Sequence, residues 1–180
     1  SNMVAKNRIA EQVARSIPNG ASLFINIGTT TEAIARALLN HQELNIVTNN
    51  LHVAAILLPK KDFNVIIAGG QVRSRDGGIV GEQTSDFINQ FKMDFGIIGI
   101  SAIHQDGSLL DYDYREVRVA QSIIKNSTNV ILSADHSKFG RTALARLGHI
   151  SQAHHLYTDQ APNQHTLDIL TTHDVRLHIA

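Results

Sequence analysis

The first segment with the chemistry to bind an anion surrounds Gly28. Three hydroxyl side chains, Thr29, Thr30 and Thr31, follow this glycine directly after a short apolar run. Glycine lets the backbone approach an anion closely, and free amides at the start of a helix can donate hydrogen bonds to it together with the hydroxyls. The pattern is therefore compatible with a site for a phosphate or a similar anion. The alternative is a capping box, because Thr29 and Glu32 have the spacing at which both side chains satisfy the helix itself.

The second polar segment contains two asparagines, Asn49 and Asn50, after the next apolar run. Side-chain amides both donate and accept hydrogen bonds, so they suit a hydroxylated ligand. The alternative is a plain turn that caps the following helix, which is a common role for asparagine.

The third polar segment is a glycine-rich connector that opens with Gly69 and Gly70 and ends at Gly81. It carries Arg73 and Arg75 between glycines, so it could move as a lid and bring a guanidinium group onto a phosphate. The alternative is a solvated surface loop in which neither arginine contributes to binding.

The fourth segment places Lys138 just after an apolar run at 129–134. A lysine ammonium is a suitable point charge for phosphate, although most lysines in loops are simply solvated. Glu116 lies near the start of an expected helix and could accept a hydrogen bond from a ligand hydroxyl. The alternative for Glu116 is an ordinary favourable charge at a helix N-terminus.

These segments can meet only if the elements before them form a parallel sheet. The expected strands are 22–27, 45–47, 63–68, 94–100, 129–134, 156–158 and 175–179, and the expected helices are 7–16, one that begins at Thr29, 51–58, 84–90, 114–126 and 164–172. Short apolar strands that alternate with helices predict an α/β domain with a Rossmann-like, mostly parallel sheet and helices on both faces. In such a sheet the ligand site lies beyond the carboxyl ends of the strands, so the four segments should converge there.

Composition restricts the function further. Sixteen basic and sixteen acidic side chains give no net charge, which argues against this chain alone binding a DNA backbone. The absence of cysteine excludes disulfides and fits a cytoplasmic protein, and the ten histidines lack metal-binding spacing. No apolar run is long enough for a membrane span, and no secretory signal is visible. No metal, cofactor or membrane partner is therefore expected.

No break in composition divides the chain, so we expect one domain over residues 3–180. Ser1 and Asn2 are typical of a tag remnant, and an amino-terminal domain could precede Met3 in the natural protein.

The polar segments resemble the effector domain of the DeoR family of bacterial repressors. The matching stretches are INIGTTT at 25–31, VTNN at 47–50, IAGG at 67–70 and ADHSKFG at 134–140, and the resemblance extends over the chain from Arg8 onward. The stretches 73–82 and 94–101 are particularly similar to the branch of the family whose effector is glycerol-3-phosphate. Asn26 is a departure, because the family usually carries aspartate there.

The resemblance implies a sensor domain, related in fold to ribose-5-phosphate isomerase, that binds a phosphorylated metabolite. By that analogy the segment 28–31 and Lys138 would hold the phosphate, and Asn49, Asn50 and Glu116 would lie near the hydroxylated end. Operator DNA would be bound by an amino-terminal winged helix-turn-helix that is absent here, and released when the effector binds. The resemblance also implies a homo-oligomer, which fits symmetric operators.

An enzyme of the same fold is the main alternative. A sugar-phosphate isomerase needs a carboxylate base over the substrate carbon. The isomerase has an acidic motif where this chain reads Ile100 to Ile103, and Ala120 aligns with its catalytic glutamate. A nucleotide-binding domain is disfavoured, since Gly28 lacks the other glycines of that fingerprint. The residues favour a binding module, with no catalytic residue.

Overall fold

The computed structural model describes residues 2–180. Ser1, which together with Asn2 is predicted to be a tag remnant, lies outside the described residues. The helices are α1 (Met3–Arg15), α2 (Thr29–Ala37), α3 (Leu51–Leu57), α4 (Glu82–Ile88), α5 (Tyr114–Lys125) and α6 (Gln164–Thr172), with 3-10 turns η1 (Leu38–Asn40), η2 (His136–Lys138) and η3 (Ile150–Gln152). The strands are β1 (Ser22–Ile25), β2 (Asn45–Thr48), β3 (Asn64–Ile67), β4 (Gln71–Val72), β5 (Ile79–Val80), β6 (Met93–Gly99), β7 (Ala102–Ile103), β8 (Ser108–Asp111), β9 (Ser127–Ser133), β10 (Ala145–His149), β11 (His155–Thr158) and β12 (Arg176–Ile179).

The centre of the molecule is a seven-stranded sheet in the order β12-β11-β9-β6-β1-β2-β3. Every neighbouring pair in this sheet is parallel. From β1 the chain first moves outward through β2 and β3, and it then returns to the other side of β1 with β6. This reversal creates a crevice between the carboxyl ends of β1 and β6, where open α/β sheets bind ligands. The predicted α/β fold with a parallel sheet is confirmed.

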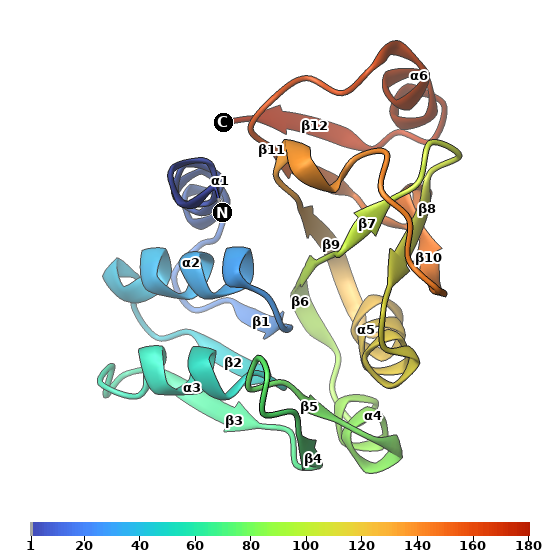
Figure 1. Ribbon diagram of the computed structural model, residues 1–180. Coiled ribbons are helices and arrows are strands. Elements are labelled where there is room, and N and C mark those ends of the chain that lie inside the picture. The colour runs from blue at the N-terminus through green and yellow to red at the C-terminus, as the bar shows by residue number, and fades with distance from the viewer. Residues whose placement is uncertain (1) are drawn as a thin grey trace.

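Helices cover both faces of this sheet, as Figure 1 shows. Successive residues of β1 point to opposite faces, because side chains alternate along a strand. Leu23 belongs to the apolar cluster that contains Ile9 of α1 and Ile34 of α2. Phe24 belongs to the cluster that contains Val119 of α5. Burial of both clusters holds the sheet between two helical layers and fixes the positions of the strand ends.

Each predicted helix and strand is present, but α1 begins at Met3 rather than at 7. Residues 3–6 lack the apolar spacing that marks a helix, although all four are tolerated in one. Their helical conformation follows from the buried side chains of Ala5 and Lys6. Within residues 2–180, no helix is long and apolar enough to cross a membrane.

Two small sheets were not predicted. An antiparallel sheet of β10, β8 and β7 follows the carboxyl end of β6, and β4 and β5 form a hairpin within the glycine-rich connector. Three of these five strands, β4, β5 and β7, have only two residues, which is too short to show an alternation of apolar and polar side chains. The first of these sheets includes β8, which ends at Asp111.

Candidate functional site

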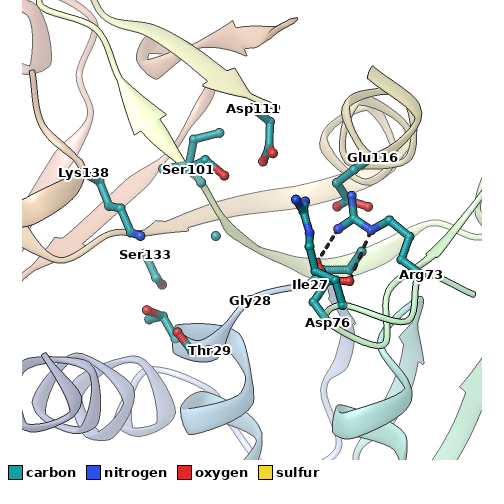
Figure 2. Close-up of a pocket in the computed structure, with 14 residues that line it drawn as sticks. Ile27, Gly28, Thr29, Arg73, Asp76, Ser101, Asp111, Glu116, Ser133 and Lys138 are labelled. Carbon is teal, nitrogen blue, oxygen red and sulfur yellow. Dashed lines mark hydrogen bonds and ion pairs between the residues drawn. The ribbon is translucent and has the colours of Figure 1, made fainter. Parts of the chain in front are cut away.

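A cavity of about 130 Å³ lies at the crevice between the carboxyl ends of β1 and β6. Its walls come from the two strand ends, the start of α2, the β4–β5 connector, the end of β8, α5, the end of β9 and η2, as Figure 2 shows. The lining residues are Ile27, Gly28, Thr29, Thr30, Arg73, Arg75, Asp76, Gly99, Ile100, Ser101, Asp111, Glu116, Ser133 and Lys138.

The turn at Gly28 presents open backbone amides to this cavity. Gly28 has φ +143°, a conformation that side-chain-bearing residues rarely adopt, and α2 begins at Thr29. The Thr31 side chain is buried in the protein. Its hydroxyl donates to the carbonyl oxygens of Asn26 and Gly28, each at 2.8 Å. The first amides of a helix have no partner within the helix, so those of Thr29 and Thr30 are available to an anion.

The capping-box alternative for this turn is not formed. The cap residue is Gly28, which has no side chain to offer, and Thr29 is exposed. Glu32 instead accepts a hydrogen bond from the Asn50 side-chain amide at 3.3 Å. The hydroxyl of Thr29 is therefore not committed to the helix.

Asn26 joins the two strands that form the crevice. Its Oδ1 atom accepts a hydrogen bond from the backbone amide of Gly99 at 2.9 Å, and the side chain is buried. Asn26 does not line the cavity, so its amide is a support behind the wall and not part of the wall itself.

Lys138 lies on one side of the cavity, near Ser133 and Thr29 in Figure 2. Burial lowers the pKa of Lys138, with Asp135 opposing this effect and nearby cations adding to it. Among the described residues, Lys138 forms no ion pair. The hydroxyl of Ser133 is buried and has no hydrogen-bond partner in that same part of the chain. A half-buried cation and an unpartnered donor at one end of a cavity form a place for an anion.

Glu116 lies on the opposite side and is buried, with 4% of its surface exposed. Its Oε2 atom accepts a hydrogen bond from Asn49 Nδ2 at 3.2 Å, whereas Oε1 has no partner within residues 2–180. Burial raises the pKa of Glu116 well above its ordinary value, and Arg73 opposes this rise only in part. Glu116 is therefore not an ordinary solvated charge at the start of α5.

Arg73 is held by two carboxylates. Its Nη2 atom lies 2.6 Å from Asp76 Oδ2, and its Nη1 atom lies 3.0 Å from Asp113 Oδ2. Arg115 reinforces this contact, because it donates to both Asp113 and the Gln71 side chain. The connector predicted to be a lid is thus a hairpin tied to the start of α5. Across the described chain Arg75 forms no ion pair, so it is the arginine of the connector with uncommitted donors.

Six of the eleven predicted site residues line the cavity: Gly28, Thr29, Thr30, Arg73, Glu116 and Lys138. The structure does not bring the other five to its wall: Thr31, Asn49, Asn50, Gly69 and Gly70. Asn49 supports Glu116, and Asn50 caps α3 by accepting from the backbone amide of His52 at 2.9 Å. The sequence analysis did not find Asp111, Ser101 or Ser133. Ser133 lies near the end of the predicted strand 129–134 and Ser101 directly follows the predicted strand 94–100, whereas Asp111 follows no predicted strand.

Gly70 has a structural role that a substitution would expose. Its φ is +155°, and a Cβ atom there would lie 2.1 Å from Thr84 Oγ1 and 2.8 Å from the Val80 carbonyl oxygen. We therefore expect Gly70→Ala to lower the free energy of unfolding by about 2 kcal/mol, since overpacking adds to backbone strain. Urea denaturation of the two variants measures the difference. Gly69→Ala is the matched control, because a Cβ at Gly69 meets no atom within 4 Å. Equal stability of the two variants would contradict the prediction.

Fold and cavity together define an α/β domain with a polar cavity at the crevice of its sheet. The model of the DeoR C-terminal sensor domain matches residues 1–160, and the chain belongs to that family. It is 58% identical to the glycerol-3-phosphate regulon repressor of Escherichia coli over 174 residues, which are 97% of this chain and 69% of that protein. The chain is therefore a ligand-sensing domain of the repressor type, as predicted.

The similar solved structures share the fold alone. Ribose 5-phosphate isomerase A from Methanocaldococcus jannaschii has a TM-score of 0.56 and 12% identity, with 77% of this chain and 55% of that chain covered. The eIF2B delta structure from Chaetomium thermophilum has a TM-score of 0.63 and 16% identity, with 86% of this chain and 55% of that chain covered. The predicted relation in fold to the isomerase is confirmed.

Proposed function

We propose that the cavity binds glycerol-3-phosphate and that binding releases operator DNA from the full-length repressor. The observation that carries the proposal is the anion site formed by Lys138, the open amides of Thr29 and Thr30, and the unpartnered hydroxyl of Ser133. The proposed phosphate-binding residues are Gly28, Thr29, Thr30 and Lys138, with Arg75 added from the connector.

The size of the cavity supports a small ligand. A volume of about 130 Å³ is far below the roughly 300–1,000 Å³ of sites for drug-sized molecules. The polar walls, with Asp111 and Glu116 opposite the anion site, suit a short chain that carries hydroxyl groups. The name of the E. coli relative supports glycerol-3-phosphate as that molecule.

The test is calorimetric titration of this domain with glycerol-3-phosphate, with glycerol and ribose 5-phosphate as controls. We expect saturable binding that requires the phosphate group. Ligand at about 100 times its dissociation constant should also raise the unfolding free energy by about 2.7 kcal/mol. Binding of ribose 5-phosphate alone would retain the phosphate site and reject the proposed ligand. Absence of binding by either phosphate would overturn the proposal.

A phosphosugar isomerase is the second candidate, and one observation favours it. The structure brings two carboxylates, Asp111 and Glu116, into the same cavity, although the sequence positions 100–103 carry none. A buried carboxyl group whose pKa is raised by burial, as that of Glu116 is, can act as a general acid or base. We propose a binding module and not an enzyme, because the relative is named a repressor. Incubation with ribose 5-phosphate, followed by NMR, should show no conversion; turnover would reverse this choice.

Release of DNA requires that the ligand bind the DNA-incompetent arrangement more tightly, with a coupling of about 1–3 kcal/mol. We propose that the connector 69–81 tightens on the ligand and changes how sensor domains pair in a cytoplasmic homo-oligomer. Operator contact would come from a segment outside this chain. Hydrogen exchange in 69–81 should slow when glycerol-3-phosphate saturates the domain, and unchanged exchange would count against this coupling.

A further inference from the structure

The cavity has opposite electrostatic character at its two sides. Lys138 and the start of α2 form a side that attracts anions. Asp111 and Glu116 line the other side, where Arg73 is held by Asp76 and Asp113. Arg75, the other arginine of the lining, is assigned to the phosphate by the proposed function. A ligand anchored by its phosphate on the first side must therefore place its remaining atoms against carboxylates.

Asp111 is the more accessible of the two carboxylates. It is the last residue of β8, and Figure 2 shows its side chain pointing into the cavity. Its Oδ1 atom accepts a hydrogen bond from the backbone amide of Tyr112 at 2.7 Å. In the part of the chain that the structure describes, it forms no ion pair. Its second oxygen is available to accept a hydrogen bond from a ligand.

Glu116 limits what can lie beside Asp111. It is buried at the back of the cavity with Oε1 unpartnered, so it adds an acceptor, or a donor when protonated, next to the same space. Burial first, and then the charge of Asp111, raise the pKa of Glu116. The two carboxyl groups thus already repel one another, and a further negative charge between them would be unfavourable.

We propose that Asp111, supported by Glu116, determines the ligand specificity of this site. The site takes monophosphates whose other end carries uncharged hydroxyl groups, and Asp111 excludes molecules that carry a second anionic group there. The hydroxyls donate to Asp111, whereas a carboxylate or second phosphate offers only acceptors to an acceptor. This inference rests on the proposed binding of a phosphorylated effector in the cavity.

The experiment compares two ligands of similar length by titration calorimetry: glycerol-3-phosphate and 3-phosphoglycerate, which has a carboxylate at the end away from its phosphate. We expect the wild-type domain to prefer glycerol-3-phosphate by tenfold or more, equivalent to about 1.4 kcal/mol. In Asp111→Asn the ratio should fall at least about fivefold, mainly because 3-phosphoglycerate binds more tightly once the repelling charge is removed. Asparagine keeps the Oδ1 acceptor for Tyr112, so β8 retains this contact.

The matched control is Asp86→Asn, on the exposed surface of α4, which changes net charge equally and lies outside the cavity. It should leave the ratio of the two affinities unchanged. Equal binding of both ligands by the wild type, or the same ratio in Asp111→Asn, would overturn the specificity role while the phosphate site stands. Absence of binding by both ligands would overturn the proposed function, and this inference with it.

Discussion

Replacement of Arg73 by methionine is expected to lower the free energy of unfolding by about 2–3 kcal/mol, because hydrogen bonds between charged groups in a part-buried network are lost. The Arg73 side chain is only 10% exposed and contacts both Asp76 and Asp113. Methionine retains the length and apolar stem of arginine, but it leaves two carboxylates and the nearby Glu116 without this cation. Urea denaturation of the purified domain measures the loss.

Arg75→Met is the matched control for this substitution. It removes the same charge from the same connector, but Arg75 is exposed and its guanidinium has no ion-pair partner among residues 2–180. The free energy of unfolding of Arg75→Met should differ from that of the wild type by less than about 0.5 kcal/mol. A similar loss in both variants would mean that the connector is insensitive to the pairing, and it would contradict the prediction.

Acid pH provides a second measure of the Arg73 contact. Burial alone would raise the pKa of Asp113, but hydrogen bonds from Arg115 and Arg73 outweigh it and hold that pKa well below its ordinary value of 3.8. A carboxylate with a depressed pKa in the folded state stabilises the protein above its ordinary pKa, and this stability is lost as pH falls. The wild type should therefore lose stability below pH 3.8, and Arg73→Met should lose less over the same range.

The anion side of the cavity could be predicted because its signals are local in the sequence. Gly28 and Lys138 each follow a buried apolar strand within a few residues. A parallel sheet then places the ends of β1 and β9 at the same edge. The positions of Gly28 and Lys138 after their strands, together with the rule for parallel sheets, were therefore enough to predict that these two residues lie close together.

The acidic side could not be predicted in the same way. Asp111 reaches the cavity only because β7, β8 and β10 form a separate antiparallel sheet, and the two residues of β7 carry no readable pattern. Glu116 was predicted, but its burial depends on Asn49 and Arg73, which lie 67 and 43 positions away in the chain. Contacts at such separations leave no signal in a single sequence.

Polar residues in loops were the least certain part of the prediction, because composition does not say which partner each will have. Asn50 satisfies the start of α3, and Asn49 supports Glu116. Arg73 and Arg75 lie two positions apart with the same chemistry, yet one is paired with two carboxylates and the other is exposed. Only the folded β4–β5 hairpin shows that Arg73 stabilises the structure and that Arg75 is available to a ligand.

Replacement of Lys138 by alanine is expected to weaken binding of glycerol-3-phosphate by about 2–3 kcal/mol, which is roughly 30-fold to 150-fold, because a charge-assisted contact in a half-buried site is lost. The variant should fold, since removal of Lys138 breaks no ion pair in the described chain. Lys92→Ala, at an exposed position outside the cavity, is the matched control and should bind as the wild type does.

The pH dependence of binding shows whether Lys138 contacts the phosphate through its charge, or whether Lys138→Ala weakens binding by changing the shape of the cavity. Burial lowers the pKa of Lys138 below the ordinary 10.5, so the ammonium loses its proton at a less alkaline pH than a surface lysine does. Affinity of the wild type for the phosphate should therefore fall on the alkaline side before pH 10.5, whereas Lys138→Ala should show no such fall. An alkaline decline of equal size in both proteins would assign the phosphate to other groups, with Arg75 and the amides of Thr29 and Thr30 as the remaining anchors.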